Sequence, residues 1–175
     1  EALERWVPAF SEFASDPSAV PAVLDLNTMV QERVALLQIR HPETAYRFRL
    51  DPAAPSAWAS PDLVRSLLTN LLENAAEAAG PGGSVLTTTR REGVTVAIEV
   101  HDSGPGLSAE ARATLFEPSI TFKEHGMGLG LSIARKNALV SGGDVTVVPG
   151  ELRGAAFRAV LPAAAEAEAA ASSPS

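Results

Sequence analysis

Two glycine-rich segments in the second half of the chain have the residue types of a nucleotide pocket. The first, Asp102-Ser103-Gly104-Pro105-Gly106, places a carboxylate in a tight turn, and the second, Gly126-Met127-Gly128-Leu129-Gly130, runs directly into a helix-like segment. A carboxylate held in a turn can accept a hydrogen bond from the amino group of a base. Bare backbone N–H groups at a helix N-terminus attract phosphates. The ordered pair therefore predicts a nucleotide site with a base-reading end and a phosphate-binding end.

Each segment also has a simpler explanation when it is taken alone. An aspartate in a turn often bonds its own backbone, and Gly-x-Gly-x-Gly also occurs in flexible loops. No strand directly precedes Gly126, which argues against a Rossmann crossover, and the Lys-Ser/Thr pair of a P-loop is missing.

A polar face on the longest predicted helix, residues 61–79, is the third candidate. Asn70, Asn74 and Glu77 are spaced four and three residues apart, so they share one face. Asparagine is a mediocre helix former, and an ordinary solvated face, which is the alternative, would more often use Lys, Glu or Gln. Amide oxygens and a carboxylate suit a hydrated Mg²⁺ ion that bridges nucleotide phosphates.

The composition restricts the class of protein. A length of 175 residues suits one domain with terminal extensions. A net charge of −7 argues against nucleic-acid partners and against contact with anionic membranes. The absence of cysteine excludes disulfides and thiolate metal sites, and the three histidines lack metal-ligand spacing. Without an apolar run of membrane-spanning length or a signal-peptide pattern, we expect a soluble, cytoplasmic domain.

Helices and strands alternate along the chain in an order that favours an α+β fold. Hairpin-connected strands with helices on one face predict a two-layer sandwich with a mixed, mostly antiparallel sheet. Residues 16–21 are expected to form a linker, and residues 51–60 and 117–126 to form loops. The predicted helices cover residues 1–14, 27–39 (capped by Asn27), 61–79, 109–116 and 131–140, and the predicted strands cover residues 46–50, 85–91, 94–101, 145–148 and 156–161.

The first fourteen residues carry an apolar stripe at helical spacing, made by Leu3, Trp6, Val7, Phe10 and Phe13. The stripe either packs on the domain or belongs to the end of a helix from a neighbouring dimerisation module. We therefore expect three regions: residues 1–24 with this helix and a linker, a domain over residues 25–162, and a disordered tail over residues 163–175.

Four ordered motifs resemble those of the catalytic, ATP-binding domain of bacterial sensor histidine kinases, within the ATPase superfamily that includes gyrase, Hsp90 and MutL. The segment from Asn70 to Ala78 resembles the N box, and the two glycine segments resemble the first and second Gly boxes. Leu115-Phe116-Glu117-Pro118 resembles the F box. The Asn-Ala-x-Glu-Ala and Phe-Glu-Pro sequences are similar to the nitrogen-regulation class of these kinases.

The resemblance implies the Bergerat ATP-binding fold, with ATP and Mg²⁺ as cofactors. Asp102 would accept from the adenine amino group, and Asn74 would be the main Mg²⁺ ligand. Asn70, on the phosphate side, and Glu73, an available base, are the candidate catalytic residues. Lys123 is a candidate γ-phosphate contact, and Arg135 is a weaker one. The remaining cofactor-binding candidates are Glu77, Gly104, Gly106, Gly126, Met127, Gly128, Leu129 and Gly130.

The chain departs from the family pattern in ways that bear on its activity. Glu77-Ala78 replaces the Lys-Tyr that many members carry, and Ser119-Ile120 replaces the usual Phe-Phe. Gyrase-like relatives have a water-activating Glu where this chain has Asn70, which argues for retention of ATP over hydrolysis. A hydrolysing or serine-kinase member of the superfamily, and an interaction module without nucleotide, are the alternatives.

No histidine of the chain resembles a phosphoacceptor, and His41 is interpreted as a loop residue. The resemblance therefore implies two partners: a histidine-containing dimerisation domain, which would supply the acceptor from outside this chain, and the receiver domain of a response regulator downstream.

Overall fold

The computed structural model of the protein describes residues 19–117 and 130–164. Two strands, β1 (Ala22–Asp25) and β3 (Ser56–Ala59), pair with each other in a small antiparallel sheet. The main sheet has five strands in the order β2-β4-β5-β7-β6, and β2 runs parallel to β4 while the other pairs are antiparallel. Its strands are β2 (Ala45–Arg49), β4 (Ser84–Glu92), β5 (Thr95–Asp102), β6 (Asp144–Val148) and β7 (Ala156–Pro162).

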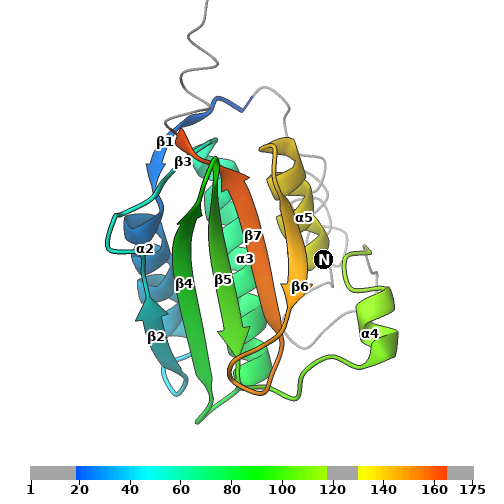
Figure 1. Cartoon of the computed structure of the whole chain (residues 1–175). Coiled ribbons are helices and arrows are strands. Elements are labelled where there is room, and N and C mark those ends of the chain that lie inside the picture. Colours follow the sequence, from blue (N-terminus) through cyan, green and yellow to red (C-terminus); the bar gives the residue numbers. More distant parts are fainter. Residues whose placement is uncertain (1–18, 118–129, 165–175) are drawn as a thin grey trace, which may run out of the picture.

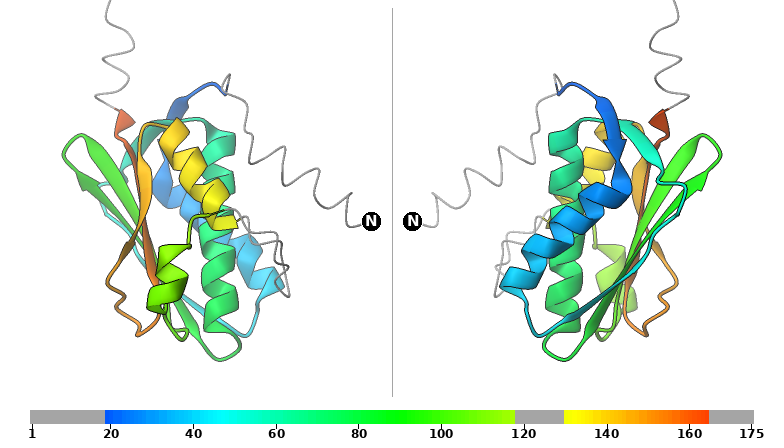
Figure 2. Two further views of the ribbon diagram at one scale, coloured as in Figure 1. Left: turned by 90° about the vertical axis from the view of Figure 1, so that its right-hand side faces the viewer. Right: turned by 90° about the vertical axis from the view of Figure 1, so that its left-hand side faces the viewer.

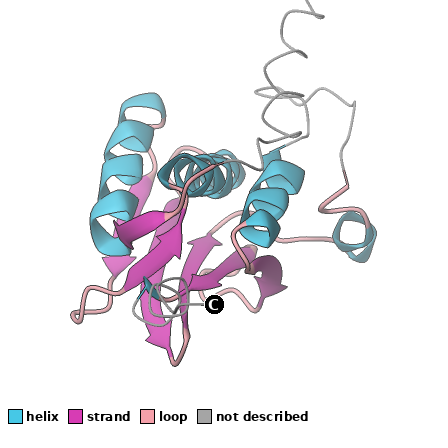
Figure 3. Cartoon of the chain, turned by 90° about the horizontal axis from the view of Figure 1, so that it is seen from above, coloured by secondary structure: helices cyan, strands magenta, loops and turns pink. Residues whose placement is uncertain are grey.

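Helices α2 (Leu26–Arg40), α3 (Pro61–Ala79) and α5 (Gly130–Val140) cover one face of this sheet, and the short helix α4 (Ala109–Ala113) lies beyond the β6 edge (Figures 1 and 2). The view from above separates the helical layer from the strand layer (Figure 3). The predicted α+β sandwich with a mixed, mostly antiparallel sheet is confirmed. None of the helices in the described part of the chain is long and apolar enough to cross a membrane.

Helix α3 forms the centre of the core, as its sequence pattern predicts. Pro61 opens the helix and Gly80 ends it with a positive φ of 67°. Leu67, Leu71 and Ala75 are fully buried against the sheet, where Ile98 and Phe157 lie in the same cluster. The polar residues Asn70, Asn74 and Glu77 of the same helix are only partly buried.

The N-terminal cap of α2 differs from the prediction. The side chain of Asp25 accepts from the backbone N–H of Thr28 at 3.2 Å, so Asp25 caps the helix instead of Asn27. Asn27 lies in the first turn. Its amide donates to the carbonyl of Asp51 at 2.8 Å and accepts from the hydroxyl of Thr89 at 2.6 Å, which ties α2 to the main sheet.

The loop predicted over residues 51–60 was partly wrong, because β3 lies within it, and the sequence also carried no sign of β1. These short strands exist only by pairing across more than thirty residues of sequence. The boundary at residue 25 therefore falls inside the fold. At the other end Ala163 and Ala164 are buried, and Ala163 donates to the carbonyl of Val94, so the fold continues past residue 162. Helix α4 ends at Ala113, before the predicted residue 116.

Several predicted features lie outside the described residues. They are the helix over residues 1–14, most of the loop over residues 117–126, Ser119-Ile120, and the tail from residue 165.

Candidate nucleotide-binding site

Asp102, the last residue of β5, is the most constrained acidic group of the site. Only 1% of its surface is exposed. Its Oδ1 accepts from the backbone N–H groups of Gly104, at 2.9 Å, and Ala155, at 3.3 Å. Its Oδ2 is buried and has no hydrogen-bond partner within residues 19–117 and 130–164. An unpaired buried carboxylate oxygen is costly, so this atom is suited to accept a hydrogen bond from a ligand.

The loop between β6 and β7 holds Asp102 in place from the other side. The backbone N–H of Asp102 donates to the carbonyl of Ala155 at 3.0 Å, and the N–H of Gly154 donates to the carbonyl of Asp102 at 3.1 Å. A Cβ on Gly154 would lie 2.2 Å from both the carbonyl oxygen and Oδ1 of Asp102. Sequence reasoning missed Gly154, although two glycines within the segment 150–154 were a signal of a close backbone approach.

Burial raises the pKa of Asp102 above its ordinary value of 3.8. Loss of solvation is the largest cause, and the N–H groups of Gly104 and Ala155, with the charge of His101, oppose it. Because the folded pKa is the higher one, Asp102 contributes stability below pH 3.8, and that contribution is lost as the pH rises through the folded pKa.

We therefore predict a pH-dependent difference between Asp102→Asn and the parent protein. The free energy of unfolding of the variant minus that of the parent should rise as the pH increases from 3.8 through the folded pKa of Asp102, because only the parent loses stability there. Above that pKa the difference should stay constant, since the amide does not ionise. Urea unfolding at a series of pH values measures it. A difference that is constant from about pH 3 to pH 7 would contradict a raised pKa.

Helix α3 connects this carboxylate to the start of α5. A Cβ on Gly104 would lie 2.5 Å from the carbonyl of Ala78, and a Cβ on Gly130 would lie 3.3 Å from Oδ1 of Asn70. Residues 70 and 78 are eight residues apart, or about 12 Å along the helix. The Asp102 turn and the N-terminus of α5 therefore approach the same helix at two separated points, which suits an elongated ligand with a base at one end and phosphates at the other.

The polar face of α3 lies between these two points. Asn70, Asn74 and Glu77 are all partly exposed there. Asn74 and Glu77 make no side-chain hydrogen bond or ion pair with any described residue, whereas the amide of Asn70 is 3.5 Å from the hydroxyl of Ser66. Gly106 has a positive φ of 78° in the turn after Asp102. Lys123 and the predicted phosphate-binding residues Gly126, Met127, Gly128 and Leu129 lie outside the described residues.

The side-chain oxygens on the polar face of α3 suit a Mg²⁺ ion, although they do not form a complete metal site by themselves. The described residues contain no group of three or more His, Cys, Asp or Glu side chains that could hold a metal ion. An amide oxygen of Asn74 and the carboxylate of Glu77 are hard oxygen ligands. Mg²⁺ commonly takes only one or two such ligands and completes its shell with water and substrate phosphates.

Glu73 lies on the flank of α3 that faces α2. Its Oε1 accepts from the guanidinium of Arg40 at 2.9 Å and lies 3.1 Å from Nε2 of His41. The sequence identified Glu73 as an available base. In the structure its carboxylate joins α3 to the end of α2, and its assignment as a catalytic residue stays a prediction. His41, interpreted as a loop residue, follows the last residue of α2.

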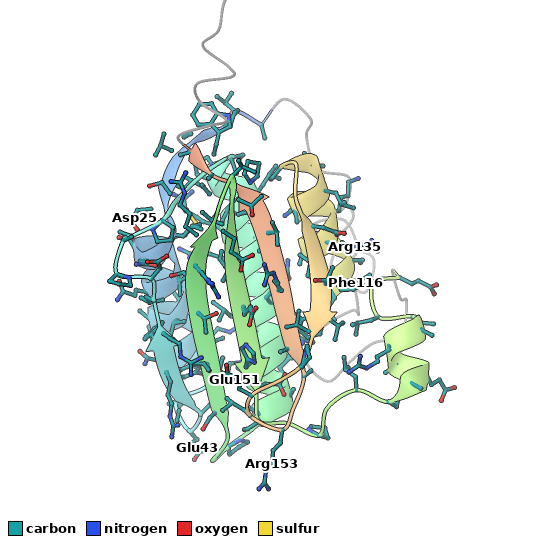
Figure 4. All side chains as sticks on the ribbon, in the orientation of Figure 1. Asp25, Glu43, Phe116, Arg135, Glu151 and Arg153 are labelled. Atoms are coloured by element: carbon teal, nitrogen blue, oxygen red, sulfur yellow. The ribbon has the colours of Figure 1, made fainter. Side chains whose placement is uncertain are left out.

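Arg135 links α5 to the F-box segment. Its guanidinium lies 5.2 Å from the centroid of the Phe116 ring, and its Nε donates to Asp144 at 3.0 Å. Phe116 also meets Phe157 edge to face, with 6.3 Å between the ring centroids. Arg135 and Phe116 lie together on the α5 side of the molecule (Figure 4). The contacts of Arg135 are therefore those of a residue that positions Phe116. The sequence had indicated Arg135 only as a weaker candidate for a γ-phosphate contact.

The geometry agrees with the family match. Residues 59–165 match the family described as histidine kinase-, DNA gyrase B- and HSP90-like ATPase. The chain belongs to this ATPase family. The match covers α3, the Asp102 turn and the loop that carries Gly154.

Known members of this ATPase family resemble the chain over most of its length. It is 36% identical to the nitrogen regulation protein NtrY of Azorhizobium caulinodans, over 92% of the chain and 22% of NtrY. The catalytic domain of the histidine kinase ThkA is 30% identical, with a TM-score of 0.74, over 81% of this chain and 95% of that one. Full-length ShkA, solved in complex with AMPPNP, is 28% identical, with a TM-score of 0.75, over 90% of this chain and 34% of that one. The chain thus spans about a fifth of NtrY.

Proposed function

We propose that this domain is the catalytic part of a sensor histidine kinase, which binds Mg²⁺-ATP and donates its γ-phosphoryl group to a histidine on another domain. The observation that supports this most directly is the buried, unpartnered Oδ2 of Asp102. The exocyclic amino group of adenine is a donor that would satisfy this acceptor, whereas the carbonyl oxygen of guanine would repel it.

In this proposal the phosphate end of the nucleotide lies against the polar face of α3 and the N-terminus of α5. Asn74, with Glu77 as a second oxygen ligand, would hold Mg²⁺, which neutralises charge on the phosphates. Asn70, beside Gly130, would line the phosphate side. Lys123 and the backbone of residues 126–130 are proposed phosphate contacts on sequence alone.

Transfer would join the γ-phosphorus to an imidazole nitrogen and break the bond from that phosphorus to the β–γ bridging oxygen. ADP would then leave, and the imidazole would pass its proton to solvent. The protein contributes mostly position and electrostatics to such a step. Asn70 carries no ionisable group that could activate water, so we propose that ATP persists until the acceptor arrives.

The two described histidines have contacts that do not suit an acceptor. Only 2% of His101 is exposed, its Nδ1 accepts from the N–H of Glu151 at 3.1 Å, and its Nε2 lies 2.9 Å from Glu99. His41 is paired with Glu73. We therefore propose that the acceptor belongs to a histidine-containing dimerisation domain, and that a response-regulator receiver domain then takes the phosphoryl group.

Calorimetric titration with AMPPNP, with and without Mg²⁺, tests the proposal. We expect Mg²⁺ to strengthen binding, and we expect Asn74→Ala to lower the affinity at least about tenfold in Mg²⁺ while leaving Mg²⁺-free binding nearly unchanged. Thr69→Ala, on another face of α3, is the control.

Absence of binding at millimolar AMPPNP would overturn the proposal and favour an interaction module without nucleotide. Steady ATP turnover by this chain alone would instead indicate a hydrolysing member of the family.

A further inference from the structure

The residue before Asp102 contacts the loop between β6 and β7 from the other face of the sheet. Because successive side chains of a strand point to opposite faces, His101 and Asp102 lie on different sides of β5. The loop, residues 149–155, bends onto the sheet face away from the helices (Figure 2). The ring of His101 meets the loop there, and only 2% of this residue is exposed.

The two hydrogen bonds of the His101 ring fix the position of its proton. The backbone N–H of Glu151 lies 3.1 Å from Nδ1, and since this group can only donate, Nδ1 must accept. In this arrangement the ring is neutral and its proton is on Nε2, which donates to Oε1 of Glu99 at 2.9 Å. The second oxygen of Glu99 accepts from Arg158 at 3.4 Å. A buried ring with both nitrogens satisfied is a rigid support for the loop.

Further along, the same loop holds Asp102. The N–H of Ala155 donates to Oδ1 of Asp102 at 3.3 Å, and the N–H of Gly154 donates to its carbonyl at 3.1 Å. The loop is tightly bent between its two contacts with β5, because a Cβ on Gly150 would lie 2.5 Å from the carbonyl oxygen of Gly154. A displacement of the loop at His101 is therefore expected to reach the carboxylate of Asp102.

We propose that His101 is a positioning residue for nucleotide binding. By accepting from Glu151, its ring holds the loop between β6 and β7, and the loop in turn holds the Asp102 carboxylate with Oδ2 left for a ligand. The effect on the nucleotide rests on the proposed function, whereas the support of the loop by His101 does not. His101 itself would not touch the nucleotide, since its side chain lies on the other face of the sheet from Asp102.

Two substitutions separate the roles of the two ring nitrogens. His101→Asn places an amide oxygen near the position of Nδ1, so it can still accept from Glu151. His101→Gln places its amide near the position of Nε2 and keeps only the bond to Glu99. We expect His101→Gln to lower the affinity for AMPPNP about 3- to 10-fold, and His101→Asn to stay within about twofold of the parent, as calorimetry measures.

Amide hydrogen exchange, followed by NMR without nucleotide, tests the loop directly. We expect the N–H groups of Glu151 and Ala155 to exchange faster in His101→Gln than in the parent, and at parent rates in His101→Asn. Glu151→Gln is the matched control. It removes only the exposed ion pair with Arg49 and keeps the backbone N–H, so it should change neither the exchange of Ala155 nor the affinity.

Equal exchange rates in the Asn and Gln variants would overturn the proposal, and so would faster exchange in His101→Gln with the affinity of the parent. A proton on Nδ1 of the parent ring would also overturn it, and a long-range proton–nitrogen NMR spectrum of the parent detects this even if neither variant folds. A parent protein that binds no AMPPNP would instead overturn the proposed function. The exchange rates would then still decide whether His101 supports the loop.

Discussion

Replacing Asp102 with asparagine is expected to lower the affinity for AMPPNP by about 10- to 100-fold, because a hydrogen bond to a charged acceptor contributes about 1.5–3 kcal/mol. The N–H groups of Gly104 and Ala155 both point at the Oδ1 position, so the amide oxygen must take that place. The amide nitrogen of the asparagine then occupies the position of Oδ2. Its N–H donor would face the N–H donor of the adenine amino group.

Asp51→Asn is the matched control for this change. The Asp51 carboxylate also accepts from two backbone N–H groups, those of Ala53 and Arg91, but Asp51 is only partly buried and belongs to the loop before β3. Its substitution should alter stability without altering nucleotide affinity. If Asp102→Asn binds AMPPNP as tightly as the parent, Asp102 is only a turn residue that bonds its own backbone. The proposal that Asp102 accepts a hydrogen bond from adenine would then be wrong.

Gly154→Ala is expected to remove nucleotide binding and to destabilise the fold by about 1–3 kcal/mol, the usual cost of overpacking. The added methyl group would overlap the carbonyl oxygen and Oδ1 of Asp102. Because both atoms belong to the residue that we propose reads the base, any relaxation that relieves the overlap displaces the carboxylate. Calorimetry with AMPPNP and urea unfolding measure the two effects.

Gly93→Ala separates the local effect from general destabilisation. Gly93 has a positive φ of 65°, so alanine there costs about 1–2 kcal/mol, but a Cβ would meet no atom within 4 Å. We expect a loss of stability comparable to that of Gly154→Ala and unchanged affinity. A Gly154→Ala protein that keeps full affinity would show that the loop between β6 and β7 does not position Asp102.

The elements that were predicted correctly are those whose signals are local. The bounds of α3 follow from Pro61, Gly80 and the Leu67–Leu71–Ala75 stripe, and the β4–β5 hairpin follows from its β-branched strands and the turn at Gly93. Asp25 and Asn27 are both good caps, so the sequence could not show which would serve. That choice depended on Asp51 and Thr89, which hold Asn27 from distant parts of the chain.

The residues of the candidate site also divide into those with a local sequence signal and those without one. Asp102, Asn70 and Asn74 were identified from the sequence because they lie in motifs with recognisable spacing. The contribution of Gly154, fifty-two residues after Asp102, was not, because its spacing from Asp102 carries no signal and only the pairing of β5 with β7 brings the two together. The engagement of Glu73 by Arg40 and His41 likewise required the packing of α2 on α3.

The sequence by itself therefore determined the α+β class, the family resemblance and the residue types that could read a base and hold phosphates, since periodicity, caps and short motifs are properties of neighbouring residues. The tertiary structure alone decided which oxygen of Asp102 is left for a ligand, that Gly154 lies against Asp102 and donates to its backbone carbonyl, and that α2 and α3 enclose a groove. These depend on contacts between segments far apart in the chain, whose geometry is set by packing of the whole core.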